Sequence, residues 1–292
     1  MPELCDEWRE RMTAHEARAD ALTADHLARR RRHEKHPVYD FLFEYYPIRP
    51  SHLRRWHPGL GCALPGRTPH ADWRDYHFDG TTTAVDAPGL WQRRGESLTY
   101  IRDLLHRTTL NPAHFDCFGL HEWAMVYKTE SPRHDLPLRL GAAGSDVVVE
   151  KHRIRCTHFD AYRFFTPAAR PLNLTVLNRA DQAAHDQAGC VHATMDLYKW
   201  ASKLGALVPS ELFLDCFELA VDARVLDMEA SPYDCRAYGF GVVPIETSEG
   251  KAEYVERQRA LAERGKPLRE RLVTLIDAAA ATTLVGHGPS SQ

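Results

Sequence analysis

Residues 210–228 constrain the fold more than any other part of the chain. Within them, acidic residues recur every three or four positions, which places them on one face of a helix. These residues are Glu211, Asp215, Glu218 and Asp222. Every other position from Leu212 to Ala223 is apolar or cysteine. A helix that is apolar on nearly all sides is a buried helix, so this segment predicts a buried helix with one narrow, acidic stripe.

The preceding segment, residues 191–204, repeats the same spacing of polar residues. Its polar positions are His192, Asp196, Lys199 and Lys203. Only residues 205–210 connect the two predicted helices, and so short a connection favours antiparallel packing. If the two polar stripes face each other, four pairs of neighbours follow: Lys203 with Glu211, Lys199 with Asp215, Asp196 with Glu218, and His192 with Asp222.

The end of this helix pair that carries His192 is the first candidate site. Two or three carboxylates meet a histidine there, and crowded carboxylates raise one another's pKa unless a cation or a metal intervenes. Histidine and carboxylates on facing helices are how helical proteins build iron and manganese sites. The spacing lacks the paired Glu-x-x-His of ferritin-like di-iron proteins. The alternative is that each stripe is the solvated face of its helix.

The second candidate is the segment 156–165, which predicts a strand. Alternation along a strand makes His158 and Asp160 project to the same side. The pair could ligate a metal facially, serve as a base oriented by a carboxylate, or form a structural hydrogen bond. A strand that leads through one loop into a helix hairpin commonly packs against it. We therefore expect one site, with the catalytic residues His158, Asp160, His192, Asp196 and Glu218. Its metal ligands would be His158, His192, Glu218 and Asp222, and the metal iron, manganese or zinc.

The third candidate is His121-Glu122, within the strand predicted at residues 117–127. In a strand the two side chains point to opposite faces, so only one of them can reach a site. Residue 125 is Met, which excludes the H-E-x-x-H of a zincin-type protease. His121 is either functional or a hydrogen-bonded core histidine. The sequence also lacks the glycine-rich dinucleotide and P-loop motifs and the G-x-S-x-G of hydrolases.

The remaining pattern predicts an α+β fold, mostly helical with a small central sheet. One globular domain is expected over residues 1–280, with an N-terminal polar and basic helix at 1–35 and a flexible tail at 281–292. Further predicted helices cover 97–108, 250–264 and 267–279. Further strands are expected at 146–165 and 240–245. Residues 57–95 predict an irregular connection with a short hairpin around Asp79-Gly80.

Composition limits the class of protein. The net charge of −3 lacks the basic excess typical of proteins that bind phosphate backbones. Seven cysteines, with no C-x-x-C among them, argue against a disulfide framework and a zinc knuckle. No apolar run approaches the roughly 18 residues of a membrane-spanning helix. The charged N-terminus has no apolar signal region. We therefore expect a cytoplasmic protein without a membrane partner.

Several long strings resemble a family of bacterial proteins labelled 3-methyladenine DNA glycosylase. They are HPVYDFLFEYY (36–46), LRRWHPG (53–59), CFGLHEWAMVY (117–127), CTHFDAYRFF (156–165), GCVHATMDLYKWA (189–201), DCFELA (215–220) and LDMEASPYD (226–234). The resemblance implies a hydrolase of DNA repair that excises alkylated bases. Such chemistry needs a base flipped into an aromatic pocket, a carboxylate, and cations for the phosphates. The residues that would bind the substrate are Arg54, Arg55, Trp56 and Tyr198.

Three hypotheses follow. The first is a DNA N-glycosylase that binds DNA, as the resemblance implies. The second is a metal-dependent enzyme, of the non-haem iron type, that acts on a small molecule through a His/carboxylate site. The third is a non-catalytic protein in which a buried polar ladder fixes the register of the helices. The sequence leaves the substrate, the metal and the oligomeric state open.

Overall fold

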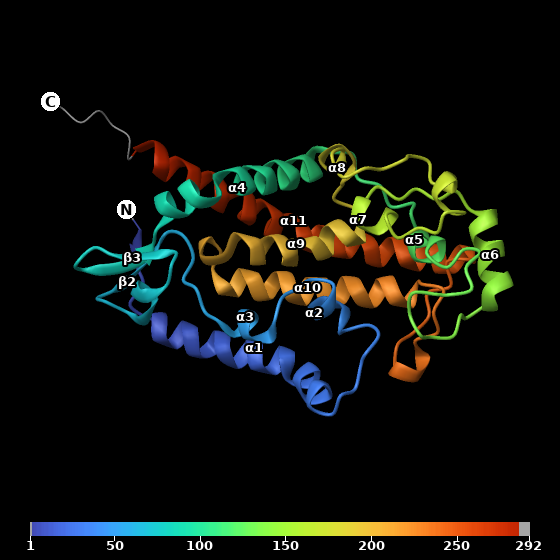
Figure 1. Ribbon diagram of the computed structural model, residues 1–292, viewed down its shortest axis with the longest axis horizontal. Coiled ribbons are helices and arrows are strands. Elements are labelled where there is room, and N and C mark those ends of the chain that lie inside the picture. Colours follow the sequence, from blue (N-terminus) through green and yellow to red (C-terminus); the bar gives the residue numbers. More distant parts are fainter. Residues whose placement is uncertain (1, 286–292) are drawn as a thin grey trace. The chain divides into compact units, whose positions relative to one another are not determined.

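The computed structural model describes residues 2–285 (Figure 1). This part of the chain is 58% helical, with eleven α-helices and one small mixed sheet of four strands. The predicted α+β class, mostly helical with a small sheet, is confirmed. None of the helices in residues 2–285 combines the length and the apolar character that crossing a membrane requires.

The chain divides into two compact units. Unit 1 comprises the residues up to Asp103, Tyr198–Phe217 and the chain from Leu268 onward, and unit 2 comprises Leu104–Leu197 and Glu218–Pro267. Four helices contribute residues to both units: α4 (Ala87–Leu110), α9 (Val191–Leu204), α10 (Ser210–Glu229) and α11 (Ser248–Val285). The expectation of a single domain over residues 1–280 stays a prediction.

Unit 1 contains the sheet. Its strands are β1 (Glu3–Leu4), β2 (Cys62–Pro65), β3 (Tyr76–Phe78) and β4 (Thr82–Val85), in the spatial order β1-β2-β4-β3. β1 runs parallel to β2, and the other neighbours are antiparallel. The turn between β3 and β4 is the predicted hairpin, where Asp79 accepts the N–H groups of Thr81 and Thr82 and Gly80 adopts φ 97°. The helices of unit 1 alone are α1 (Trp8–Arg31), α2 (Phe41–Glu44) and α3 (Pro50–Arg54).

Unit 2 consists of helices joined by long loops. The helices that lie in it alone are α5 (Leu120–Ala124), α6 (Gly141–Lys151), α7 (Phe159–Tyr162) and α8 (Gln182–His185). Four short 3₁₀ turns complete the chain: η1 (Pro69–Asp72), η2 (Arg170–Leu172), η3 (Gly205–Leu207) and η4 (Arg236–Tyr238).

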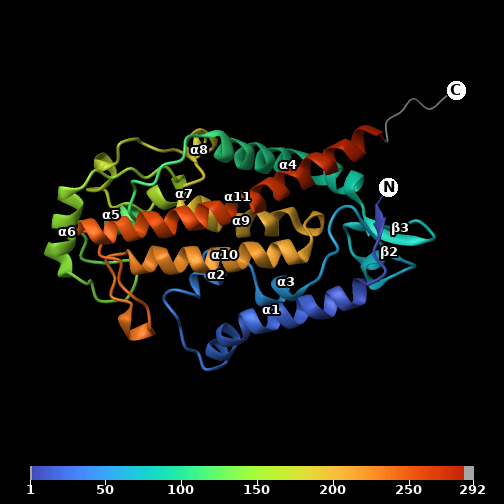
Figure 2. The ribbon, with the colours of Figure 1, turned by 180° about the vertical axis from the view of Figure 1, so that it is seen from behind.

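The predicted helix pair is present. α9 and α10 begin and end within one residue of the predicted bounds and run antiparallel on either side of the turn at residues 205–209 (Figures 1 and 2). α10 is buried as expected, with Leu212, Leu214, Cys216 and Ala220 fully inaccessible to solvent. The burial of α10 was therefore predictable from its own sequence.

The predicted ion pairs between α9 and α10 in unit 1, Lys203 with Glu211 and Lys199 with Asp215, are wrong. Glu211 binds Arg11 of α1 at 3.0 Å, and Asp215 binds Arg18 of α1 at 2.8 Å. Trp56 also donates its indole N–H to Glu211, at 3.2 Å. Arg11 and Arg18 are seven positions apart, which places them on one face of α1. The two acids of the α10 stripe in unit 1 therefore pair with a third helix, α1.

Three predicted strands are wrong, because short apolar runs do not distinguish a strand from a buried helix or loop. Residues 117–127 contain α5, residues 146–165 contain the end of α6 and all of α7, and residues 240–245 are an irregular segment. The predicted helices 250–264 and 267–279 are one helix, α11, which contains Pro267. α11 includes residues 281–285 of the predicted tail, and the rest of that tail lies outside the described residues.

Candidate metal centre

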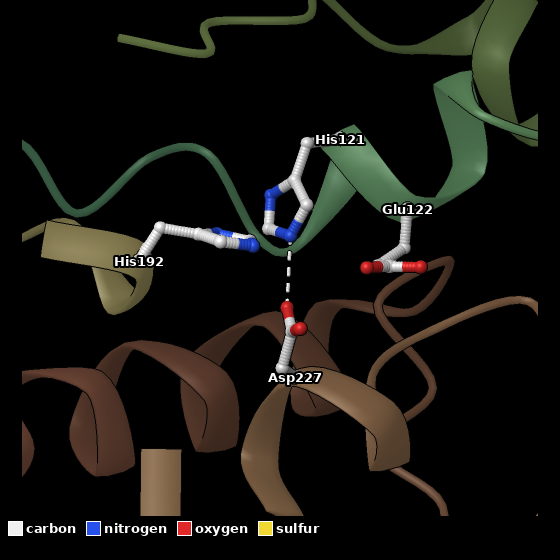
Figure 3. Close-up of side chains that lie close together, drawn as sticks. All are labelled: His121, Glu122, His192 and Asp227. Atoms are coloured by element: carbon white, nitrogen blue, oxygen red, sulfur yellow. Dashed lines mark hydrogen bonds and ion pairs between the residues drawn. The ribbon is translucent and has the colours of Figure 1, made fainter. Parts of the chain in front are cut away.

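Four side chains of unit 2 converge on one buried point (Figure 3). His121 and Glu122 come from α5, His192 from the first turn of α9, and Asp227 from the last turn of α10. One potential ligand atom of each lies within 4.8 Å of the others. The exposed fractions are 4%, 4%, 7% and 0%, in the same order. We call these four residues the His/carboxylate cluster.

The short helix α5 explains how two consecutive residues reach the same cluster. Phe118 and Gly119 both adopt left-handed backbone angles, with φ 46° and 68°, and turn the chain into the helix. Side chains that follow one another in a helix are about 100° apart, whereas in a strand they point in opposite directions. Both His121 and Glu122 therefore belong to the His/carboxylate cluster. The prediction that only one of them could reach a site is wrong. Trp123 ties α5 to the end of α10 by donating its indole N–H to the Ala230 carbonyl at 2.9 Å.

Asp227 is the centre of the polar contacts in the cluster. His121 Nε2 lies 2.8 Å from Asp227 Oδ1, and the guanidinium of Arg224 lies 2.8 Å from Asp227 Oδ2. The same Arg224 nitrogen is 3.6 Å from Glu122 Oε1, and Arg224 is itself fully buried. Arg224 thus holds one oxygen of Asp227 and leaves the other oxygen facing the histidines.

The protonation states in the cluster follow from burial and from neighbouring charges. Burial opposes ionisation of Asp227, but the adjacent His121, His192 and Arg224 outweigh it and hold the pKa of Asp227 well below its ordinary value. Burial, and secondarily the charge of Asp227, raises the pKa of Glu122. Burial, and secondarily a charge on His121, holds the pKa of His192 well below its ordinary value. The lowered pKa favours the neutral imidazole of His192, which is the form that binds a metal.

His121 Nε2 and Asp227 Oδ1 are in direct contact through a hydrogen bond of 2.8 Å. All four potential ligand atoms of the cluster lie within 4.8 Å of one another. Two imidazoles with two carboxylates are a donor set that suits iron, manganese or zinc.

A second polar group adjoins the cluster. The ring of His158 stacks on that of His192 with centroids 5.4 Å apart, and His158 Nε2 lies 3.3 Å from Asp196 Oδ2 and 4.0 Å from Asp186 Oδ2. Asp186 in turn accepts the side-chain N–H of Gln182 at 2.9 Å. The structure thus brings together three of the residues predicted to share one site: His158, His192 and Asp196. Their catalytic roles stay predictions.

The other predicted site residues lie elsewhere. Asp160 is in α7 instead of a strand, and it binds Arg179 at 2.6 Å and Arg163 at 3.3 Å. Asp222 is half exposed and binds Arg264 at 2.7 Å. Glu218 is partly buried on α10 and does not belong to the His/carboxylate cluster. The predicted ligand set of His158, His192, Glu218 and Asp222 is therefore not assembled as such.

The predicted substrate-binding residues of unit 1 have different environments. Arg54 binds Glu16 and Asp20, each at 2.9 Å, which neutralises its charge. Trp56 is buried and donates to Glu211, and Tyr198 is buried against the ring of Phe213. Arg55 alone among the four is exposed without a carboxylate partner in residues 2–285. These contacts reduce the positive charge that the chain can offer to DNA.

Sequence reasoning missed Asp227 and Arg224, and it treated His121-Glu122 as a separate candidate of which only one residue could reach a site. Arg224 and Asp227 lie outside the acidic stripe of α10, at a spacing of i and i+3 among apolar residues. Two opposite charges on the buried side of a helix almost always have partners, so this spacing was a usable signal. It identifies a buried ion pair, but not the histidines that join it.

In comparisons with known proteins, no family model, no curated protein and no solved structure matches the chain.

Proposed function

We propose that the protein is a metal-dependent enzyme that acts on a small molecule. Its metal would be a divalent iron, manganese or zinc ion, held by His121, His192, Asp227 and Glu122. The observation that supports this most directly is the convergence of four potential ligand atoms, from three separate helices, within 4.8 Å in a buried position.

The chemistry of the cluster supports a cation at this position. Two carboxylates, Glu122 and Asp227, lie in a buried place, and among residues 2–285 Arg224 is the guanidinium that forms ion pairs with both. Burying charge without compensation is costly, so a second carboxylate must either take a proton or meet a cation. A divalent ion would supply that cation. Arg224 would orient Asp227, as outer-shell partners of metal ligands do.

The donor set supports an enzyme more than a purely structural site. Structural zinc sites are mostly built from cysteine and histidine, whereas catalytic sites keep a position open for water or substrate. Two histidines combined with carboxylates belong to the class of donor sets that non-haem iron enzymes use.

Metal analysis tests the proposal. The full-length protein, purified without added metal, should contain about one equivalent of iron, manganese or zinc by plasma mass spectrometry. His192→Ala and Asp227→Asn should each lose the ion. Asp160→Asn removes an equally buried carboxylate of unit 2 outside the cluster and should retain it.

A second control separates metal loss from unfolding. His70 is a buried histidine of unit 1 that bonds to the Trp56 carbonyl. His70→Ala should keep the ion even where it lowers stability. A protein that is free of metal as purified, and that binds none of the three ions when they are added back, would refute the proposal.

The resemblance alone supports excision of alkylated bases from DNA. The ion pairs of Arg54 with Glu16 and Asp20 weigh against a strong phosphate contact there. This activity therefore remains the second proposal, and its test is DNA binding as a function of salt.

A further inference from the structure

We propose that unit 1 contains a binding site for a small phosphorylated molecule, independent of the metal proposed in unit 2. The site is a cavity of about 420 Å³, within the range of small-molecule sites. Its walls come from two parts of unit 1, residues 46–57 and residues 199–213, with Asp75 beside them. A phosphate ester is the ligand class that the charges of these walls favour.

Among the charged side chains of the lining, positive ones outnumber negative ones. Arg55, Lys199 and Lys203 are the three cations, and Asp75 is the one acid. Asp75 is paired with Arg93 at 2.9 Å, so its charge is already balanced. Within residues 2–285, neither Arg55 nor Lys203 forms an ion pair with a carboxylate. A concave surface with an excess of positive charge concentrates anions.

Arg55 is suited to a phosphate. Its guanidinium lies over the ring of Trp73, with 5.5 Å between the carbon and the ring centroid. This contact restricts the side chain before a ligand arrives, which lowers the entropy lost on binding. A guanidinium presents paired N–H donors that match phosphate oxygens, and a lysine adds a mobile point charge.

Hydrogen bonds hold the two walls of the cavity together. His57 N–H donates to Ser210 Oγ at 2.7 Å, and Ser210 N–H donates to the His57 carbonyl at 3.0 Å. Leu60 N–H donates to the Leu207 carbonyl at 3.0 Å. These bonds join the segment after Arg55 to the turn that follows Lys203. The cavity is therefore formed before the ligand binds.

Gly59 allows this close approach of the two walls. It adopts φ 83°, and a Cβ atom at this position would lie 2.5 Å from the ring of Pro209. Such a contact is far shorter than real Cβ atoms make, and the backbone angle also favours glycine. The His57-Pro58-Gly59 segment thus has a structural role in placing one wall against the other.

Isothermal titration with inorganic pyrophosphate at low ionic strength tests the site. Pyrophosphate should bind the full-length protein with a dissociation constant in the millimolar range or tighter. The variant that combines Arg55→Gln with Lys203→Gln should weaken binding by about tenfold or more, since bonds between charged groups are the strong ones. The control variant combines Lys151→Gln with Arg153→Gln, which removes the same charges from exposed positions of unit 2. It should bind as the unaltered protein does.

Three results would overturn the inference. The first is no heat of binding at several millimolar pyrophosphate. The second is an equal loss of affinity in the control variant, which would mean that net charge alone attracts the anion. The third is displacement of pyrophosphate by a short DNA duplex at much lower concentration, which would assign the cations to a nucleic-acid backbone. A phosphorylated small molecule as the ligand predicts none of these.

Discussion

Replacing Asp227 by Asn perturbs the centre of the His/carboxylate cluster with almost no change of volume. The substitution removes one negative charge and leaves the side chain the same size, so no cavity forms. The buried guanidinium of Arg224, 2.8 Å from residue 227, would then face an uncharged amide instead of a carboxylate. His121 would also lose its carboxylate partner, which lies at 2.8 Å. Both consequences lower the stability of the folded protein.

The size of the effect follows from burial. Breaking a buried ion pair by removing one partner costs about 3–5 kcal/mol, because the remaining charge is left uncompensated. Glu122 stays 3.6 Å from Arg224 and compensates in part. We therefore expect Asp227→Asn to lower the free energy of unfolding by about 3 kcal/mol, the lower end of that range.

The assay is urea unfolding followed by circular dichroism, with and without a chelator. With the chelator present, the difference between the variant and the unaltered protein measures the lost contacts to Arg224 and His121 without any contribution from a bound metal. Without it, the unaltered protein should gain further stability from its bound metal, and the variant should not. Asp222→Asn is the matched control, because Asp222 is on the same helix and its pair with Arg264 is half exposed. An exposed pair contributes about 0–1 kcal/mol.

Two results would refute this reasoning. A loss below about 1 kcal/mol for Asp227→Asn would mean that Arg224 does not depend on this carboxylate. Equal losses of unfolding free energy in Asp227→Asn and Asp222→Asn would mean that burial does not determine how much stability is lost when an ion pair is broken. If the chelator does not change the stability of the unaltered protein, the metal proposal is contradicted. The reasoning about the ion pair would not be affected by that result.

Three further predictions concern other parts of the chain. The free energy of unfolding should fall as the pH drops from about 6.5 to about 4. Burial lowers the pKa of His57 and of His134 to about 4, whereas the same histidines in the unfolded chain take up protons near the ordinary value of 6.5. A urea midpoint that is constant over this interval would contradict the assignment. Gly59→Ala should lower the free energy of unfolding more than Gly61→Ala does. Both glycines have positive φ, but of the two only Gly59 has an atom within 4 Å of the added Cβ. Equal unfolding midpoints for the two variants would show that this contact does not affect stability. If the protein binds DNA, the logarithm of its affinity should fall with that of salt by about 0.9 per phosphate contact, and Arg55→Gln should reduce the slope by about one contact; binding that is absent at low salt, or indifferent to salt, counts against base excision.

The sequence by itself determined the helices that have a clear period. The spacing of polar residues in α9 and α10 predicted their bounds, their antiparallel packing and the burial of α10. These features are local, since the period of 3.6 residues and a short connection are both visible along the chain. The hairpin at Asp79-Gly80 was predictable for the same reason, because its turn depends on its own residues.

Only the tertiary structure decided which faces meet. Glu211 and Asp215 have partners on α1, about 200 positions away, where the sequence pattern suggested neighbours on α9. A periodic pattern identifies the polar face of a helix but contains no information about which element covers it. The strands expected from apolar runs failed similarly, because a short run of five or six apolar residues is compatible with a strand, a helical turn or a buried loop.

Some residues of the candidate site were predictable from the sequence, and others are brought together only by the tertiary structure. His158, His192 and Asp196 were identified from their spacing on single segments, and the structure places them together. Asp227 and His121 are 106 positions apart and meet only because α5 packs against the end of α10. The turn of α5 depends on two left-handed residues, and without that turn Glu122 would point away from His121. Glu211, Asp215 and Asp222 of the periodic stripe thus bind arginines. The cluster that could hold a metal uses Asp227, an acid of α10 outside the stripe that is fully buried in unit 2.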